Sequence, residues 1–407
     1  MPTPSEKEQD NRVSILINGK VHSAWSRYQI DSDFLIPADA WSVSLGLPDG
    51  VFPPGITRGV PVQVNVGADT VMVGRVDSIQ RSISRKQCTL SLSGRDGAAI
   101  LVDCAAPIFT SRQLGLEEVI ANIVRPLGIT KIRINAESAI RNDKVSIEPG
   151  ERAWDALVRA AAGRGLWPWF EPDGTLVVGG PDYTTPPVAT LIMQFDGGGN
   201  NLLSINDNSS INGSFSELTV LGQGHGQGSK SKALRIVDID DDSTQRATRD
   251  NADDSQDDDV NHAIGTAETG QHGLKAVIKD PAVPYYRPQI MVVGDADNLD
   301  QVRYRGRKAM ADARLAGYSL TGVVAGHRNT DGVLWEPGQR IHVRSEPHGI
   351  DGIFFLMGRE FVGGRTEGET TTLRLKEDGV WIPDAFPKKK KGRKKKKTKA
   401  LGIVDVE

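Results

Sequence analysis

Residues 91–107, SLSGRDGAAILVDCAAP, place an arginine, two aspartates and a cysteine within ten positions. Arg95 and Asp96 come first, and Asp103 and Cys104 follow. Carboxylates, a guanidinium and a thiol at this spacing could support acid–base or nucleophilic chemistry. The segment is therefore a candidate reactive cluster.

The same segment also fits a corner between two units of the chain. It follows an alternating run and ends on a proline, Pro107. In this interpretation Gly94 and Gly97 supply turns, Asp103 caps backbone N–H groups, and Cys104 acts as a small apolar residue.

Residues 222–231, GQGHGQGSKS, resemble a phosphate-binding loop. A P-loop needs the spacing G-x-x-x-x-G-K-[ST] and a helix that begins at the lysine. Here a serine separates Gly228 from Lys230, and the following ALRIVDIDDD is not helical in pattern. A flexible linker is the favoured interpretation.

Residues 238–259, DIDDDSTQRATRDNADDSQDDD, could suggest calcium binding. An EF-hand needs glycine at the sixth position and glutamate at the twelfth. With Asp238 as the first position, the sixth is Ser243, and no glutamate follows in register. The pattern favours a mobile acidic loop, because the segment is too polar to bury much surface.

No other pattern identifies an enzyme. The sequence lacks H-E-x-x-H, C-x-x-C and G-x-S-x-G motifs, and its seven histidines form no ligand spacing: His22, His225, His262, His272, His327, His342 and His348. Plentiful aspartates leave a glycosidase-type carboxylate pair open, but no pair is singled out. We predict no enzyme, no catalytic, cofactor-binding or metal-binding residues, and no cofactor.

Composition describes an ordinary globular chain. The 407 residues are 38% hydrophobic and 25% charged, which is enough for two to four domains. No 18-residue apolar run and no secretory signal are visible. Two cysteines, Cys88 and Cys104, are too few for a disulfide framework. We expect a chain that is made and folded in the cytoplasm.

Charge is distributed unevenly. Residues 388–399, KKKKGRKKKKTK, carry ten positive charges and leave the remaining residues at −13. Residues 385–407 are predicted to be a disordered, lysine-rich tail, and two alternatives stay open: a solvated end, or a segment that binds a polyanionic partner.

Residues 11–108 have the pattern of a β unit. VSILI and KVH flank Asn18-Gly19, the signature of a tight hairpin. About seven short alternating segments follow one another, with no helix among them. They predict a sandwich or barrel.

Residues 109–182 change to a helical period. Apolar residues from Leu116 to Leu127, and again from Trp154 to Ala162, fall on one helix face. A turn at Pro172-Asp173-Gly174 joins two short strands. This unit is predicted to be a small α+β insert.

A second β unit is predicted from residues 183–221 and 318–384. It is interrupted by residues 222–317, which hold the acidic loop and a long basic helix. The helix is expected to bury a narrow stripe of small residues, with Arg303, Arg305, Arg307, Lys308 and Arg314 on its other faces. The stripe consists of Leu299, Val302, Gly306, Ala309, Ala313 and Ala316.

Several segments, taken in order, resemble the baseplate hub proteins of Mu-like contractile-tailed phages, the P or late-control D-type tail proteins. The resemblance covers roughly residues 11–386. It rests on INGKVHSAW, GRDGAAILVDCAAP, DPAVPYYRPQIMVVGDADN, RKAMADARLAG and GVLWEPGQRIHVRSEPHGIDGIFFLMGREF. The family has no catalytic residues that could be carried over.

The resemblance implies a mainly β fold with two antiparallel β-barrel-like domains, two smaller α/β domains and a trimeric ring. It also implies a virion protein that adapts a six-fold tail tube to a three-fold spike and surrounds a DNA channel. Its expected partners are two further copies, the central spike, the tail tube, the tape-measure protein and other baseplate proteins, with no stable membrane insertion.

The charge of −13 outside the tail predicts an acidic channel wall. The alternative function is a tail-associated protein that degrades or binds peptidoglycan, because SIEPGERAWDALVRAAAGRG is faintly similar to a LysM module.

Overall fold

The computed structural model describes residues 11–85, 87–111, 115–135, 145–162, 165–222, 274–294, 299–365, 368–381 and 404–405. The acidic stretch 238–259, most of the linker 222–231 and the lysine run 388–399 lie outside these ranges. The described chain is mainly β, as predicted, and most of its strands join one large, mostly antiparallel sheet. No helix in the described ranges is long and apolar enough to cross a bilayer.

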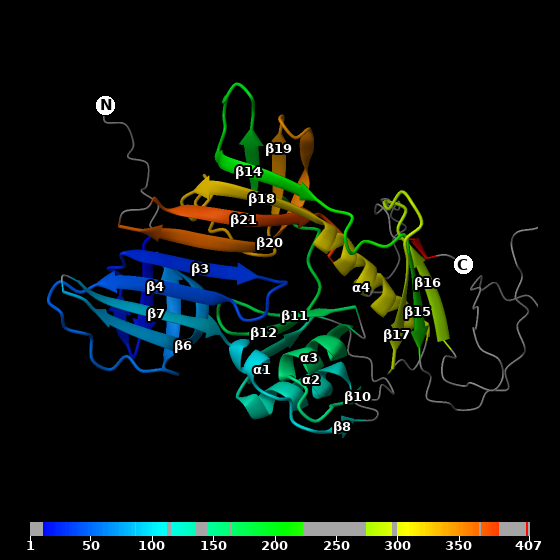
Figure 1. Cartoon of the computed structure of the whole chain (residues 1–407), viewed down its shortest axis with the longest axis horizontal. Coiled ribbons are helices and arrows are strands. Elements are labelled where there is room, and N and C mark those ends of the chain that lie inside the picture. The colour runs from blue at the N-terminus through cyan, green and yellow to red at the C-terminus, as the bar shows by residue number, and fades with distance from the viewer. Residues whose placement is uncertain are drawn as a thin grey trace, which may run out of the picture.

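The first β block has seven antiparallel strands, coloured blue to cyan in Figure 1, and not all neighbours in the sheet are consecutive in the chain. Asn18 (φ 50°) and Gly19 (φ 75°) form the predicted hairpin turn between its first two strands. The seven strands are β1 (Val13–Ile17), β2 (Lys20–His22), β3 (Arg27–Asp33), β4 (Ala40–Gly46), β5 (Pro61–Val66), β6 (Asp69–Ile83) and β7 (Cys88–Asp96).

The prediction that residues 11–108 contain no helix was wrong. A five-residue helix, α1 (Ala99–Asp103), follows β7 directly. Ala98, Leu101 and Ala106 pack into the core of the next unit rather than into the first β block. The apolar run here is too short to show a helical period, so packing determines its conformation.

The next unit is the predicted α+β insert. Its helices α2 (Leu116–Val124) and α3 (Ala153–Ala162) bury their apolar faces together. Gly174 (φ 81°) forms the expected turn between β11 and β12. The short strands are β8 (Thr110–Ser111), β9 (Ile132–Ile134), β10 (Val145–Ser146), β11 (Trp167–Phe170) and β12 (Leu176–Gly179), and a 3₁₀ turn covers Arg125–Leu127.

The second β block extends the same sheet. Strand β3 pairs antiparallel with β20, so the two blocks share a continuous ladder and one apolar core (Figure 1). The strands of this block are β13 (Ala189–Met193), β14 (Leu202–Ser209), β18 (Tyr318–Ala325), β19 (Arg340–Ser345), β20 (Ile350–Gly364) and β21 (Thr370–Glu377).

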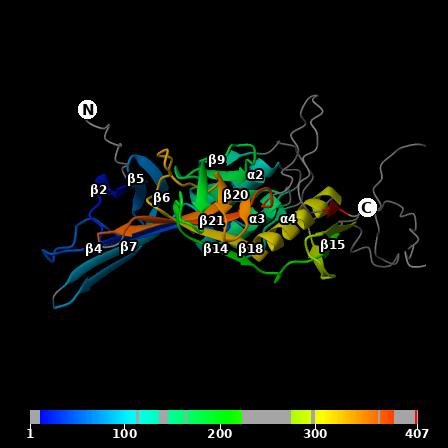
Figure 2. The same ribbon diagram turned by 90° about the horizontal axis from the view of Figure 1, so that it is seen from above.

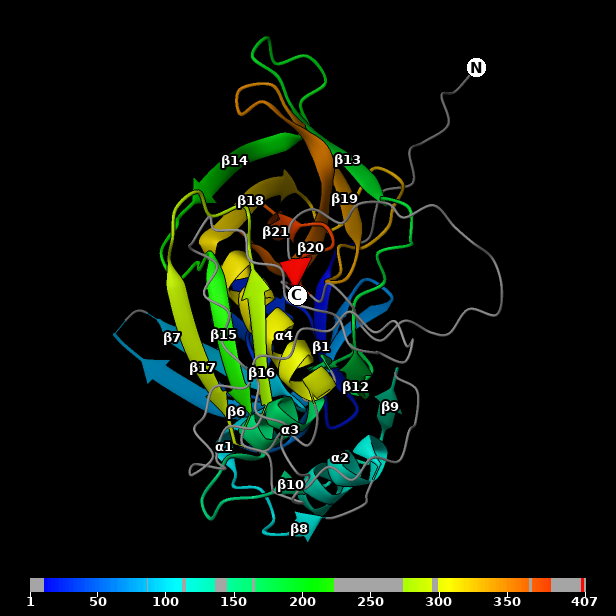
Figure 3. The same cartoon turned by 90° about the vertical axis from the view of Figure 1, so that its right-hand side faces the viewer.

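A separate four-stranded sheet lies at the other end of the molecule. It contains β15 (Glu217–Gly222), β16 (Leu274–Lys279), β17 (Pro288–Val293) and β22 (Val404–Asp405). Figure 3 shows α4 (Leu299–Gly317) against one face of it. The sequence interpretation assigned residues 217–221 to the second β block, but β15 pairs only with β16 and β17.

Helix α4 follows its predicted stripe in its first half alone. A side chain on Gly306 would meet Ile278 and Val220, so the glycine permits the expected close approach. Farther along, Ala316 is exposed, and Lys308, predicted on an open face, is 5% exposed. The helix leaves the small sheet there and passes Trp167, whose ring centroid lies 4.6 Å from Lys308 Nζ.

The two β blocks have the same strand order. The first block reads β3-β4-β7-β6-β5-β1 across the sheet, and the second reads β14-β18-β21-β20-β19-β13. The equivalent strands also follow one another in the same order along the chain. One difference is the last pair, since β1 runs antiparallel to β5 whereas β13 runs parallel to β19.

Irregularities in the ladders repeat as well. The β6–β7 ladder shifts at Val76, and the β20–β21 ladder shifts at Leu356. The N–H of Val76 donates to the carbonyl of Val60 at 3.0 Å, and that of Leu356 donates to Gln339 at 2.9 Å. Because β-bulges are specific local features, the match indicates two copies of one β module.

Candidate functional site

Arg95 is the centre of an ion-pair cluster at the end of β7. Its Nε lies 2.6 Å from Asp77 Oδ2, and its two terminal nitrogens contact Asp103 at 2.6 and 3.1 Å. Asp103 therefore binds a guanidinium, and its predicted role as a backbone cap was wrong. Cys104 is half-buried and none of these contacts involves it.

The two glycines of this segment allow close approach. Gly94 lies inside β7, where an added Cβ would stand 1.9 Å from the carbonyl oxygen of Arg75. Gly97 begins the turn into α1, and a Cβ there would be 2.7 Å from the Phe170 ring. Neither residue has a positive φ. The prediction that both glycines supply turns was wrong for Gly94, which lies inside β7, whereas Gly97 does lie in a turn.

We expect Arg95→Gln to lower the free energy of unfolding by less than about 1 kcal/mol. Its side chain is 30% exposed, and solvent weakens ion pairs at such positions. Urea unfolding followed by circular dichroism measures the change. A loss above 2 kcal/mol would show that the cluster determines the fold at this corner.

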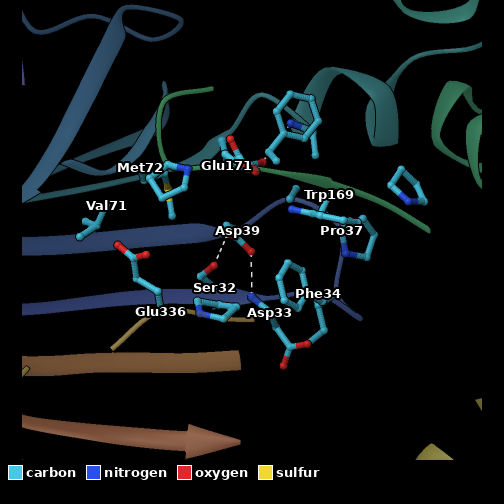
Figure 4. A pocket seen from close by; sticks show the side chains of 18 of the residues that line it. Ser32, Asp33, Phe34, Pro37, Asp39, Val71, Met72, Trp169, Glu171 and Glu336 are labelled. Atoms are coloured by element: carbon cyan, nitrogen blue, oxygen red, sulfur yellow. Dashed lines mark hydrogen bonds between the residues drawn. The ribbon is translucent and has the colours of Figure 1, made fainter. Parts of the chain in front are cut away.

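A cavity of about 350 Å³ lies where the first β block, the α+β unit and the second β block meet. Figure 4 shows Asp39, Phe34 and Glu336 around it, with Trp169 across from the strands. Asp39 accepts hydrogen bonds from the Ser32 hydroxyl and, at 2.9 Å, from the Asp33 N–H. The loop between β3 and β4 is thus held by one carboxylate.

Two carboxyl groups at this cavity have raised pKa values. Burial raises the pKa of Asp39 to about 6, against opposing hydrogen bonds from Ser32 and the Asp33 N–H. Burial and then the charge of Asp39 raise the pKa of Asp96 well above its usual value. Such shifts are typical of catalytic sites. Here both carboxyls bind backbone N–H groups instead. Asp39 accepts the hydrogen bond from Asp33 described above, and Asp96 accepts a hydrogen bond from the Ala98 N–H at 3.0 Å.

Asp39 gives a pH dependence that Asp39→Asn should remove. A raised pKa means that the folded state retains the proton, so stability relative to the variant increases as pH falls from 8 through 6 to 4. We expect a relative gain on the order of 2 kcal/mol. Urea unfolding of both proteins across this range measures it.

Asp103→Asn provides the matched control for that experiment. The guanidinium of Arg95 lowers the pKa of Asp103, so its contribution is lost as pH falls, the opposite sign. Parallel stability curves for the chain and Asp39→Asn would contradict the assignment.

The junction between the blocks contains a buried cation and a buried imidazole. Arg359 is 1% exposed and donates to the Ile30 carbonyl at 3.1 Å. Burial lowers its pKa to about 10 despite the charges of Asp39 and Glu336. His327 contacts the Tyr28 hydroxyl at 2.8 Å, and burial lowers its pKa to about 4, so it is neutral at pH 7.

Sequence reasoning missed both residues, although one signal was present. Arg359 interrupts the apolar run GIFFLMGREFVGG, where a charge implies either exposure or a buried partner. Among the described residues, no group of three or more His, Cys, Asp or Glu side chains is placed to hold a metal ion. His225, His262 and His272 lie outside the described ranges.

One face of the large sheet is uncovered and rich in hydroxyl groups. Its side chains alternate with buried core residues along β4, β7, β18 and β21. The Ser44 and Ser91 hydroxyls on it are 3.1 Å apart. We call it the polar sheet face, and it includes Ser42, Ser44, Thr89, Ser91, Ser93, Thr321, Thr370 and Thr372.

Several charges on the polar sheet face form ion pairs. Arg374 bridges Asp31 and Asp33, with a distance of 2.7 Å from its Nε to Asp33, and Arg95 pairs with Asp77. Gln29 bonds Glu360 across the junction. The arrangement provides a continuous polar surface. Such a surface suits contact with another molecule, or the passage of a molecule along it, better than catalysis.

Four family models match consecutive parts of the chain. Residues 12–96 match the N-terminal domain of Mu phage baseplate assembly protein GpP-like proteins, and residues 98–180 match the second domain of baseplate hub protein gp44-like proteins. Residues 262–310 match the third domain of tail protein NMB1110-like proteins, and residues 312–380 match a tail protein C-terminal domain.

Individual relatives agree with these matches. The chain is 39% identical to the tail protein from Neisseria meningitidis MC58, with a TM-score of 0.73 over 92% of this chain and 99% of that one. The 43 kDa tail protein of prophage MuSo2 from Shewanella oneidensis shares the fold at 21% identity, with a TM-score of 0.71 over 91% and 99% of the two chains. Baseplate hub protein gp44 of Escherichia phage Mu is 21% identical over 94% of this chain and 92% of its own.

The fold, the uncovered polar face and these matches define a structural protein of a phage tail baseplate. The family resemblance found in the sequence is confirmed: the chain belongs to the Mu-like baseplate hub proteins. The segment that was compared with a LysM module falls within the hub second-domain match.

Proposed function

We propose that this chain is the trimeric hub that adapts a six-fold tail tube to a three-fold central spike. The observation that carries the proposal is the repeated β module, with one strand order and one bulge position in both copies. Three chains then present six similar modules. A ring of this kind can contact six-fold and three-fold neighbours on opposite sides.

The polar sheet face is proposed to line the channel for phage DNA. Hydroxyl side chains and paired charges offer DNA few fixed cations to bind, so the duplex would slide. Because the aspartates on this face pair with Arg95 and Arg374, the wall would be closer to neutral than the acidic wall predicted from net charge.

The proposed partners are the central spike, the tail tube, the tape-measure protein and other baseplate proteins of the virion. Assembly is proposed to take place in the host cytoplasm. The division into the units 11–108, 109–182, 183–221 with 318–384, 222–317 and 385–407 stays a prediction from the sequence, as do the absence of catalytic and cofactor sites and the role of the lysine-rich tail.

Light scattering coupled to size-exclusion chromatography tests the trimer. We expect a species with three times the 44.0 kDa mass of one chain, increasing with protein concentration. A protein that stays monomeric or dimeric up to the highest soluble concentration would contradict the proposal.

A further inference from the structure

The described part of the large sheet has open strand edges at β2, β13, β14 and the second half of β6, and the last two are equivalent to strands that pair with each other inside the chain. Strand β6 pairs with β5 only along Asp69–Arg75, so its second half, from Ser78 to Ile83, is paired on one side alone, with β7. Strand β14 pairs only with β18 and lies at the border of the sheet in Figure 3. Ile83 is 73% exposed. Open edges of this kind are sites for strand pairing.

The junction inside the chain shows what such edges pair with. By the module repeat, the second half of β20 is equivalent to the second half of β6, and β3 is equivalent to β14. Within the chain, Gly358–Gly364 of β20 pairs antiparallel with β3 over seven residues. The open half of β6 and the open edge of β14 are therefore equivalent to the two strands of the β20–β3 junction, but they do not pair with each other within the chain.

These two edges cannot meet within one chain. Strand β14 is at one end of the strand order, and β6 lies beyond β20, β3, β4 and β7. Figure 2 shows the first β block extending away from the rest of the sheet. Pairing of these two edges with each other therefore requires two chains.

We propose that the second half of β6 in one copy pairs antiparallel with β14 of the next copy, extending the sheet from chain to chain. This inference rests on the proposed trimeric hub and specifies its interface. Each chain then contributes one internal and one external junction of the same kind. Three copies joined head to tail close the ring with six such junctions.

The register follows from the internal junction. Asp77 of β6 and Met357 of β20 are the equivalent bulge residues. On the other edge, Ile205 of β14 is equivalent to Tyr28 of β3. Ile205 pairs with Gly322 in the same way as Tyr28 pairs with Val43. Transferring the β20–β3 pairing gives five central pairs between copies. They are Ile79 with Ser209, Gln80 with Asn208, Arg81 with Asp207, Ser82 with Asn206, and Ile83 with Ile205.

The side chains in this register are complementary. It places Arg81 opposite Asp207, and Ile83 opposite Ile205. Opposite charges and apolar residues directly across an antiparallel pair are stabilising. A slip by two residues would place Arg81 opposite Ser209 or Ile205 and remove both matches. The register follows from backbone hydrogen bonds alone, so the match of the side chains supports the pairing separately.

A cysteine cross-link tests the pairing in the full-length chain. Gln80→Cys and Asn208→Cys are introduced together, with Cys88 and Cys104 replaced by serine so that no native thiol competes. After oxidation we expect a covalent trimer under denaturing conditions. The register control, Gln80→Cys with Asn206→Cys, should cross-link at least about fivefold less, because its residues are diagonal rather than opposite.

A charge exchange provides a second readout that a folding defect cannot imitate. Arg81→Glu and Asp207→Lys should each raise the midpoint concentration for assembly about tenfold, because like charges then face each other. The double variant should return within about threefold of the unmodified chain. Thermal unfolding of each variant shows whether the fold is intact.

The outcomes separate the two proposals. A trimer that forms no 80–208 cross-link, or that forms the 80–206 cross-link equally well, overturns the pairing and leaves the hub standing. A chain that stays monomeric at every concentration and forms no cross-link overturns both. Failure of the charge exchange to restore assembly, with both single variants folded, also overturns the pairing.

Discussion

Gly94→Ala should prevent the first β block from folding normally, with a loss of about 3 kcal/mol or more. The added methyl group would stand 1.9 Å from the Arg75 carbonyl oxygen and 2.8 Å from the Trp41 ring. Both neighbours are fixed, one as backbone in the β6 ladder and the other as a side chain 1% exposed. Overpacking against atoms that cannot move is strongly destabilising.

Urea unfolding and amide hydrogen exchange of the first block measure this effect. The matched control is Gly46→Ala in β4, where an added Cβ has no atom within 4 Å and φ is not positive. The control should stay within about 1 kcal/mol of the unmodified chain. A Gly94→Ala protein as stable as the control would show that β6 and β7 can separate without cost.

Arg359→Met should cost about 3 kcal/mol by leaving buried acids without their cation. The guanidinium lies 4.0 Å from the Phe361 ring centroid and beside Asp39 and Glu336, inside the β20–β3 junction. Removing one partner of a buried charge pair leaves the other uncompensated. Methionine keeps much of the side-chain volume, which limits any cavity effect.

A double-mutant cycle shows whether charge is the cause. Arg359→Met combined with Asp39→Asn should be less destabilised than the sum of the single changes, by at least about 1 kcal/mol. Chemical unfolding of the four proteins at pH 7 gives the coupling free energy. Exact additivity would mean that Arg359 acts through its packing alone.

Local elements were predictable where the residue types of one segment are sufficient to determine its conformation. The turn at Asn18-Gly19 needs positive φ at both residues, and that requirement is visible in the residue types. Helix α2 shows its apolar period within nine residues. In such segments local preference and tertiary packing agree, so the pattern is sufficient.

Features that depend on distant contacts were not predictable. The burial of Lys308 depends on Trp167, more than a hundred residues earlier in the chain. The β20–β3 pairing joins strands about 330 residues apart, and the pattern of each strand is compatible with several neighbours. Asp39 and Asp96 become one site only when the cavity forms between three units.

The module repeat was also hidden in the sequence. After alignment by the ladders, Gly59-x-x-Val62-x-Val64 corresponds to Gly338-x-x-Ile341-x-Val343. Both glycines have positive φ, at 80° and 96°. Three matching positions are too few to be recognised without the hydrogen bonds that align them.

Covalent linkage of the two modules has a kinetic consequence. In the proposed ring, half of the seams form during the folding of each chain, at the effective concentration set by the polypeptide, and only the other half depend on encounters. Two encounters bring three chains together and the last seam then closes within the assembly, whereas six separate modules would need five encounters. Fewer kinds of incomplete ring can therefore accumulate in the cell and compete for spikes and tubes.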